Sequence, residues 1–192
     1  MKKNIELENL SELIEKLKNQ GNKIVLCHGV FDLMHLGHIK YFKEARSYGE
    51  VLVVTITPDE FVRRGPGRPI FNSEQRAEAI ASLEIVDFVS INKWDTAVNT
   101  INLINPDFYV KGPDYKDHSN DVTGKIMLEQ KAVEKHNGKI IFTSSETFSS
   151  TKLIKNNFSL FTKKQKHFLD SIKNKYSFQE IKSFLDMLMS KK

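Results

Sequence analysis

Residues 24–38 of this chain have the sequence IVLCHGVFDLMHLGH. The run from Ile24 to Cys27 is short, continuous and apolar, which is typical of a strand buried on both faces of a sheet. A turn with Gly29 follows, and a helix is predicted from about Leu36 to Tyr48, where Gly49 ends it. A strand, a turn and a helix in this order predict the first unit of an α/β fold.

The same alternation continues along the chain. Further strands are predicted at residues 51–56, 86–91, 108–110 and 140–142, and helices at 9–19, 74–83, 95–104 and 121–136. Asn72 and Gln75 are predicted to form a capping box, and Asp95 to cap the following helix. The pattern predicts a Rossmann-like five-stranded parallel sheet with helices on both faces. Ligands of such sheets bind beyond the carboxyl ends of the strands, where the strand order reverses.

A C-terminal helical appendage is also predicted. We place the main domain at residues 1–157, with its N-terminal helix within 1–22, and a helical hairpin or linker at 158–192. Ser177 and Glu180 fit a capping box, and apolar residues follow at helical spacing from Ile181 to Leu188. These apolar faces need a partner, which could be the main domain, a second copy of the chain or a further domain.

The charge distribution bears on the choice of partner. The net charge is +5, but residues 152–192 carry 10 lysines and 3 acidic residues, whereas residues 1–151 carry 19 basic and 21 acidic residues. A solvated helix explains this excess better than a groove for nucleic acid. The sequence shows no signal peptide and no apolar run of membrane-spanning length. The single cysteine, Cys27, fits a buried thiol in a reducing compartment, so we expect a cytoplasmic protein.

His35 and His38 are spaced so that both rings can face one point at the start of a helix. The helix N-terminus offers free N–H groups to a phosphate, and Gly37 allows a ligand close to the backbone. Two imidazoles at such a position suit the charge that develops on a phosphoryl group. The alternative is two incidental histidines that pair with carbonyl groups, but the strand–turn–helix context favours the site.

Three further segments follow predicted strands. Ser149, Ser150 and Thr151 could hold phosphates at a helix start, although simple N-capping is a common use of serine. After the fourth strand, Gly112 allows close approach and Asp114 could bind ribose hydroxyls or substrate, or the segment is an ordinary Gly-Pro turn. The loop arginines of residues 63–68, with Arg76 on the next helix, could close over triphosphate oxygens, or the loop is solvated and mobile.

Together these motifs resemble the cytidylyltransferase-like family of nucleotidyltransferases that carries a His-x-Gly-His motif, over roughly residues 23–157. The heptose-phosphate adenylyltransferase branch is similar at residues 74–76, 81–87, 95–96 and 110–115. The glycerol-3-phosphate cytidylyltransferase branch is similar at residues 35–40 and 57–61.

This chain also departs from both branches. The glycerol-phosphate branch carries Arg-Thr-Glu before its Ser-Thr signature, where residues 144–147 here contain no arginine, and Glu84 stands where that branch has an arginine. The heptose branch reads Lys-Gly-Gly-Asp-Tyr, and here Pro113 replaces the second glycine. The base and the acceptor therefore both stay open.

The resemblance implies a reaction in which an acceptor phosphate attacks the α-phosphorus of CTP or ATP and pyrophosphate leaves with Mg²⁺. It implies no metal site made by the protein alone. The acceptor would be a phosphorylated sugar, polyol or similar small molecule, and the product a CDP- or ADP-linked precursor of a cell-surface glycan. The implied catalytic residues are His35, His38 and Lys40, with Lys40 preferred to Lys43.

The resemblance also implies the binding residues. The nucleotide would be held by Gly29, Val30, Phe31, Gly37, Arg76, Lys111, Gly112, Asp114, Ser149, Ser150 and Thr151. The acceptor would meet Arg63, Arg64, Arg68 and Tyr115. Asp32 is interpreted as a carboxylate that stabilises the turn. We expect no nucleic-acid or membrane partner, and a homodimer.

Two alternatives compete with this interpretation. A class I aminoacyl-tRNA synthetase shares a His-x-Gly-His signature, but this chain is too short and its main domain lacks a basic surface for tRNA. The second is a catalytically silent nucleotide-binding module, or a domain split from a bifunctional kinase and nucleotidyltransferase. An assay of pyrophosphate release with each NTP would separate an enzyme from a silent module.

Overall fold

The computed structural model describes residues 3–63, 65, 67–116, 125–144, 163–177, 179, 180, 183 and 187. The chain forms two compact units, residues 1–150 and 151–192. The predicted boundary at 157/158 and this one both fall in residues 145–162, outside the described residues. In the described part, no helix is long and apolar enough to cross a membrane.

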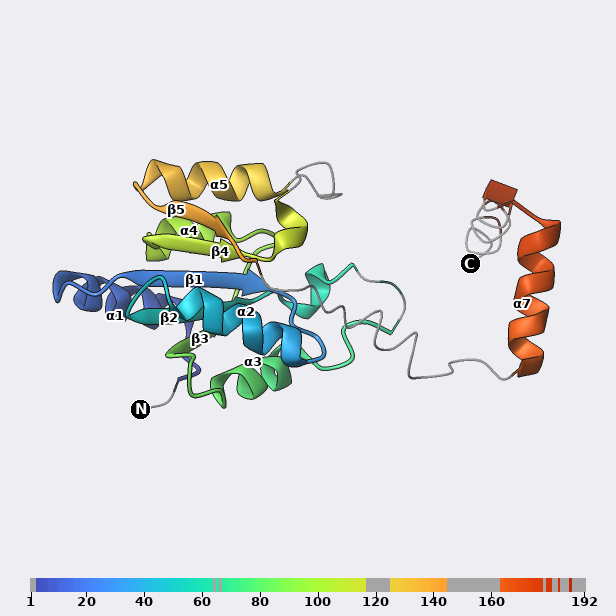
Figure 1. The fold of residues 1–192 in the computed structure, drawn as a ribbon, viewed down its shortest axis with the longest axis horizontal. Coiled ribbons are helices and arrows are strands. Elements are labelled where there is room, and N and C mark those ends of the chain that lie inside the picture. The colour runs from blue at the N-terminus through green and yellow to red at the C-terminus, as the bar shows by residue number, and fades with distance from the viewer. Residues whose placement is uncertain are drawn as a thin grey trace. The chain divides into compact units, whose positions relative to one another are not determined.

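The first unit alternates strands and helices, as predicted (Figure 1). Its elements are α1 (Leu7–Asn19), β1 (Ile24–Gly29), α2 (Leu36–Arg46), β2 (Val51–Ile56), η1 (Asp59–Phe61), α3 (Ser73–Ala81), β3 (Phe88–Ile91), α4 (Val98–Ile104), β4 (Phe108–Lys111), η2 (Pro113–Tyr115), α5 (Lys125–Lys135) and β5 (Lys139–Phe142).

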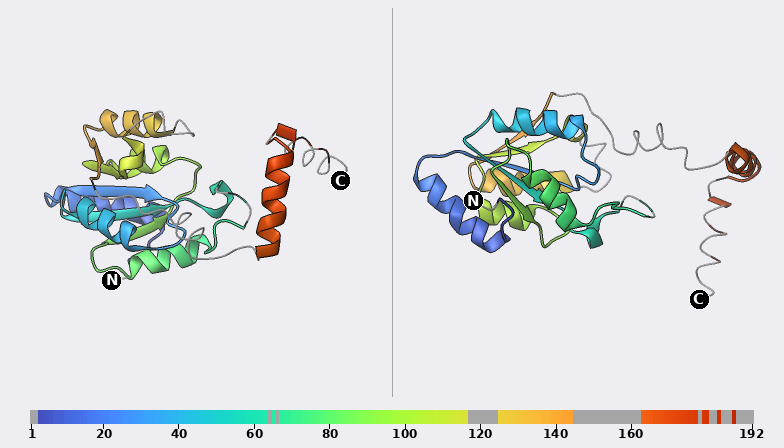
Figure 2. Two further views of the ribbon diagram at one scale, coloured as in Figure 1. Left: turned by 45° about the vertical axis from the view of Figure 1, so that its right-hand side comes forward. Right: turned by 90° about the horizontal axis from the view of Figure 1, so that it is seen from below.

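The five strands form one parallel sheet in the order β3-β2-β1-β4-β5. One core cluster packs the sheet against α1, α4 and α5, and a second packs it against α2 and α3. Figure 2 shows these helices on the two faces of the sheet. The connections from β1 through β2 to β3 run toward one edge of the sheet, and the connection from β4 to β5 runs toward the other. Because such crossovers are right-handed, the helices of the two sets lie on opposite faces. The strand order therefore reverses between β1 and β4, which is where a ligand is expected.

Several predicted boundaries move. β1 extends two residues beyond the predicted run, because His28 and Gly29 pair with Thr55 and Ile56. The polar residue at 28 hides this extension from an apolar pattern. The third strand begins at Phe88 instead of residue 86, and α2 ends at Arg46 instead of residue 48.

The two predicted caps differ in outcome. The capping box of Asn72 and Gln75 is confirmed, with both of its reciprocal hydrogen bonds present. The prediction that Asp95 caps the next helix is wrong: Ala97 occupies the N-cap, and Asp95 accepts from Lys125 Nζ at 2.6 Å instead. Lys125 is distant from Asp95 in sequence but close to it in the fold. Its bond to the Asp95 carboxylate replaces the predicted cap of α4.

The second unit contains α7 (Lys163–Lys175). The capping box of Ser177 and Glu180 is confirmed, because Ser177 N donates to Glu180 Oε2 at 2.8 Å and Glu180 N donates to Ser177 Oγ at 3.3 Å. Phe168 is 63% exposed. Leu169 and most of the predicted helix at 181–188 lie outside the side chains that the structure describes.

Candidate active site

The turn after β1 is built around the ring of Phe31. Phe31 has φ of 49°, a left-handed conformation that is uncommon for a bulky residue and clusters at functional sites. Its ring folds back over Gly29, where an added Cβ would lie only 3.0 Å from Phe31 Cζ. The ring packs on Phe42 at 5.1 Å and meets His38 edge-on at 5.4 Å between centroids. A side chain at residue 29 would therefore press on a ring that lies against the histidine motif.

The two histidines meet at the N-terminus of α2. His35 is the N-cap residue, with extended backbone, and its carbonyl accepts from His38 N at 2.9 Å. The two rings are stacked, with centroids 3.8 Å apart and planes 18° from parallel. This confirms that the spacing brings both rings to one place. The carboxyl end of β1 and the start of α2 lie at the same edge of the sheet (Figure 1).

The pKa of His35 is lowered from its ordinary value, because burial penalises the imidazolium form, against a smaller raising effect from its own backbone. Burial therefore favours the neutral form of the His35 ring.

Asp32 fastens the loop between β2 and α3 to this turn. Its Oδ1 accepts from Ile70 N at 2.7 Å and Phe71 N at 3.2 Å, and its Oδ2 pairs with Nε of Arg68. Asp32 is only 4% exposed. The carboxylate has a structural role, but the contacts found for it anchor a loop 36 or more residues away, where the sequence predicted that it stabilises its own turn.

Arg76 is the second anchor of the same loop. Its Nη1 donates to Val30 O at 2.5 Å, its Nη2 to Thr57 O at 2.9 Å and to Asp59, and its Nε to Phe71 O at 3.0 Å. The side chain is 0% exposed. The guanidinium has no exposed surface to offer a nucleotide, so the structure assigns it to holding Val30 and the loop ends in place.

The loop arginines separate into different environments. The side chain of Arg68 is 11% exposed, and within the described part of the chain its Nη2 has no hydrogen-bond partner. Arg63 is exposed, and its charge lowers the pKa of Asp95 as a smaller contribution beside that of Lys125. Arg64 lies outside the described residues. Among the described loop arginines, Arg68 is therefore held in place, with one buried donor that has no partner in the described part of the chain.

Lys111 ends β4 in a buried ion pair. Its Nζ lies 3.1 Å from Glu129 Oε2, and the two side chains are 7% and 5% exposed. Burial opposes the charge on Lys111, but the Glu129 carboxylate outweighs it and raises the lysine pKa. Glu129 also accepts from Tyr109 Oη at 2.8 Å and from Ala97 N at 3.1 Å, so this pair joins β4, α4 and α5.

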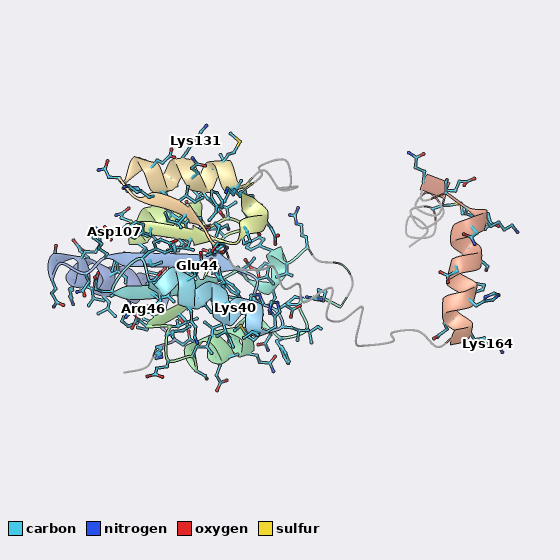
Figure 3. All side chains as sticks on the ribbon, in the orientation of Figure 1. Lys40, Glu44, Arg46, Asp107, Lys131 and Lys164 are labelled. Carbon is cyan, nitrogen blue, oxygen red and sulfur yellow. The ribbon has the colours of Figure 1, made fainter. Side chains whose placement is uncertain are left out.

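The segment after β4 remains open at the sheet edge. An added Cβ at Gly112 would meet nothing within 4 Å, which leaves room beside its backbone. Asp114 is exposed, and Lys111 Nζ lies 4.6 Å from the centre of the Tyr115 ring. The exposed side chain of Lys40 lies on α2, two residues after the histidine motif (Figure 3). Gly37 is buried in the first turn of that helix.

Two buried polar groups were missed by the sequence analysis. His28 lies between two hydroxyls, with Nδ1 3.0 Å from Thr55 Oγ1 and Nε2 3.2 Å from Thr57 Oγ1. Burial is the main cause that lowers its pKa to about 4. Glu129 was the other omission, and its position between Ile126 and Val133 on the buried face of a helix was a usable signal.

The hydroxyl motif Ser149, Ser150 and Thr151 lies outside the described residues. Among the residues that are described, no group of three or more His, Cys, Asp or Glu side chains is placed to hold a metal ion.

The fold and the histidine motif define a nucleotidyltransferase domain. The sequence profile of the cytidylyltransferase-like family matches residues 26–157, and the chain belongs to this family. The bifunctional protein HldE of Aliarcobacter butzleri is 44% identical over 125 residues, which are 64% of this chain and 26% of that protein. The protein of the same name from Campylobacter jejuni is 39% identical over 150 residues, 77% of this chain and 30% of its own length. The chain thus spans less than a third of these relatives.

Solved structures show the same fold. A lipopolysaccharide core biosynthesis protein from Thermoplasma volcanium is 31% identical, with a TM-score of 0.55, over 66% of this chain and 100% of that chain. A pantoate-beta-alanine ligase from Francisella tularensis is 20% identical, with a TM-score of 0.51, over 78% of this chain and 72% of its own. The second likeness shows the fold alone.

Proposed function

We propose that this chain transfers a nucleoside monophosphate from CTP or ATP to the phosphate of a phosphorylated sugar, polyol or similar small molecule. Pyrophosphate is released, and the product is an activated precursor of a cell-surface glycan. The stacked pair of His35 and His38 at the N-terminus of α2 carries this proposal. Membership of the cytidylyltransferase-like family and the names of the relatives support it.

The chemistry needs positioned charge more than a general base. An acceptor phosphate oxygen forms a bond to the α-phosphorus in line while the bond to the β-phosphate oxygen breaks. A phosphate monoester is largely dianionic near neutral pH, since its second pKa is about 6, so no side chain has to remove a proton. The residues then orient the reactants and stabilise the transition state.

The roles follow from position. The rings of His35 and His38, with the positive N-terminal end of α2, stabilise the α-phosphoryl transition state. Ser149, Ser150 and Thr151 hold the β- and γ-phosphates. Lys40 contributes a cation from the same helix. Mg²⁺ enters with the nucleotide as part of the substrate and neutralises charge on the leaving pyrophosphate.

The nucleotide and acceptor meet the loops at the carboxyl edge. We assign the nucleoside to the backbone of Gly29 to Phe31 and of Gly112. Asp114 binds the ribose hydroxyls, and Lys111 supports this segment from the end of β4. Arg68 is the preferred contact for the acceptor phosphate because Asp32 holds it beside the turn after β1, and a shift of the loop would expose its buried Nη2, which has no partner among the described residues. Arg63, Arg64 and Tyr115 complete the acceptor side.

The full biological unit is also a proposal. The relatives are about three to four times as long as this chain's share of them, so the domain can act alone or as one part of a bifunctional design with a sugar kinase. We further propose a homodimer in the cytoplasm. The buried free thiol of Cys27, whose pKa burial raises to about 12, is compatible with a reducing compartment.

A substrate screen tests the proposal. Pyrophosphate release is measured with CTP, ATP, GTP and UTP against a panel of sugar phosphates and polyol phosphates, with unphosphorylated sugars as controls. The expected result is turnover with CTP or ATP and with a phosphorylated acceptor only. Tight binding of an NTP without turnover for any pair would favour the silent nucleotide-binding module.

A further inference from the structure

The loop between β3 and α4 is held in place by buried polar side chains. Asn92 Nδ2 donates to Trp94 O at 2.6 Å and to Thr96 O at 2.9 Å. Where the loop meets α4, Ala97 N donates to Glu129 Oε1 at 3.1 Å. Asn92 and Glu129 are both buried. The backbone of this loop is therefore set by groups in the interior, as a precise binding site requires.

This loop carries an ion pair at the carboxyl edge of the sheet. Lys125 Nζ donates to Asp95 Oδ1 at 2.6 Å and to Asp95 O at 3.0 Å. Asp95 lies after β3, and Lys125 is the first residue of α5, the helix between β4 and β5. Because the strands are parallel, both residues lie at the edge where α2 begins. The ion pair is therefore on the same side of the sheet as the stacked histidines, at the edge where ligands of such sheets bind.

The ion pair has hydrogen-bonding capacity that the described residues do not use. The side chains of Lys125 and Asp95 are 29% and 36% exposed. The ammonium group has a third N–H beyond its two bonds to Asp95, and no described residue donates to Asp95 Oδ2. A hydroxyl group both donates and accepts, so neighbouring hydroxyls can donate to this carboxylate and accept from this ammonium. Bonds of this kind, to charged groups, are stronger than neutral ones.

The charge around the ion pair suits a ligand that also carries a phosphate. The hydrogen bond from Lys125 is the main cause that lowers the pKa of Asp95, and the charge of Arg63 is a smaller cause. Arg63 on the loop after β2 thus lies close enough to act on Asp95. Two cations beside one carboxylate leave this part of the edge positive, which favours an anionic ligand.

We propose that Asp95 and Lys125 bind hydroxyl groups on the carbon skeleton of the acceptor. The inference rests on the proposed function, because that proposal makes the acceptor a phosphorylated sugar, polyol or similar small molecule. It adds the residues that distinguish a hydroxyl-bearing acceptor from a plain alkyl phosphate. A site built to bond hydroxyls rejects an analogue that lacks them, because its polar groups then lose their partners.

The test uses two matched pairs of acceptors with the full chain. Mannose 1-phosphate is compared with cyclohexyl phosphate, and glycerol 3-phosphate with propyl phosphate, so that the members of a pair differ in their hydroxyl groups. The parent protein is expected to favour the hydroxyl-bearing member of a pair in kcat/KM. Asp95→Ala and Lys125→Met should each lower this preference about 10-fold, the scale of a lost hydrogen bond to a charged group, with the KM for the NTP unchanged. An ion pair this exposed adds little to stability, so both variants should fold, which their unfolding temperatures check.

The control is Lys93→Met, which breaks a second ion pair of the same loop, with Glu8 of α1. It should keep the preference of the parent protein.

The outcomes separate this inference from the proposed function. If the parent protein shows no preference within either pair, or if Asp95→Ala and Lys125→Met keep its preference, the hydroxyl site is refuted while the proposed function stands. Equal losses with both members of a pair would indicate a structural role and also overturn it, as would turnover of other acceptors but of none of these four. If no acceptor of any kind is turned over, the proposed function fails, and the inference fails with it.

Discussion

The carboxylate of Asp32 pairs with Nε of Arg68 and leaves Nη2 of that guanidinium without a partner among the described residues. The same carboxylate holds the backbone of Ile70 and Phe71. A loop arginine is thereby fixed beside the histidine turn, and its unpartnered Nη2 is buried there.

Arg68→Gln is expected to raise the KM for the acceptor about 10-fold or more while the KM for the NTP changes little, because a charged donor to phosphate is lost. Asp32→Asn should raise both constants, since it releases the loop as well as the arginine. Steady-state kinetics with each substrate varied in turn checks this. Arg63→Gln, on the same loop, should raise the KM for the acceptor less, and an equal effect from it would count against a special role for Arg68.

The histidine pair should control turnover more than binding. His35→Ala and His38→Ala are each expected to lower kcat by about 10²–10³, on the scale of losing one transition-state donor. NTP affinity, measured separately, should change far less. Rates near those of the parent protein would refute the assigned role. Leu36→Ala, an exposed residue between them, serves as the control.

Lys111 and Glu129 should show strong coupling in stability. Lys111→Met alone leaves the Glu129 carboxylate buried without its cation, and we expect a loss of about 3 kcal/mol in the free energy of unfolding. The double variant Lys111→Met/Glu129→Gln should lose less than that single variant, because no charge is left buried and the amide still accepts a hydrogen bond. Urea unfolding of both singles and the double measures the coupling. Additive losses would show that the pair acts independently.

His28 should make the fold sensitive to acid. Its pKa falls from 6.5 to about 4 in the folded chain, chiefly because of burial. The unfolded chain therefore binds the proton first, so the contribution of His28 to stability is intact above pH 6.5 and is lost as the pH falls toward 4. The full loss is about 3 kcal/mol, at 1.36 kcal/mol per pKa unit.

The measurement compares urea unfolding at pH 7 and pH 4.5. His28→Asn, which can still form a hydrogen bond to a neighbouring threonine, should be less stable at pH 7 but should lose less on acidification. His167→Asn, at an exposed histidine of α7, should lose as much unfolding free energy between pH 7 and pH 4.5 as the parent protein. If His28→Asn loses as much unfolding free energy on acidification as the parent protein, other groups cause the acid sensitivity.

Truncation can test whether the C-terminal unit forms the proposed dimer. A chain that ends at Asn157 is expected to be monomeric if the apolar residues of α7, such as the exposed Phe168, form the proposed dimer. Analytical ultracentrifugation of both chains decides this. An unchanged oligomeric state and solubility in the shorter chain would argue against a dimer role for the appendage.

Much of the fold was readable from local pattern. Apolar runs and helical spacing predicted five strands and their intervening helices, and His35 and His38 were predicted to meet because their spacing on a helix start is a local property. The extension of β1 through His28 was not readable, because a polar residue interrupts the apolar pattern and only the partner strand shows the pairing.

The sequence by itself determined the alternation of elements, the family motif and the two histidines at the start of α2, because these depend on neighbours in the chain. Only the tertiary structure decided which charged side chains already have hydrogen-bond partners within the protein. Arg76 and Arg68 look alike in sequence, yet one is buried on three carbonyl oxygens and a carboxylate, whereas the other is held by Asp32 with a donor unused. Their partners come from distant segments, and the contacts of a guanidinium are fixed by packing and not by its place in the chain.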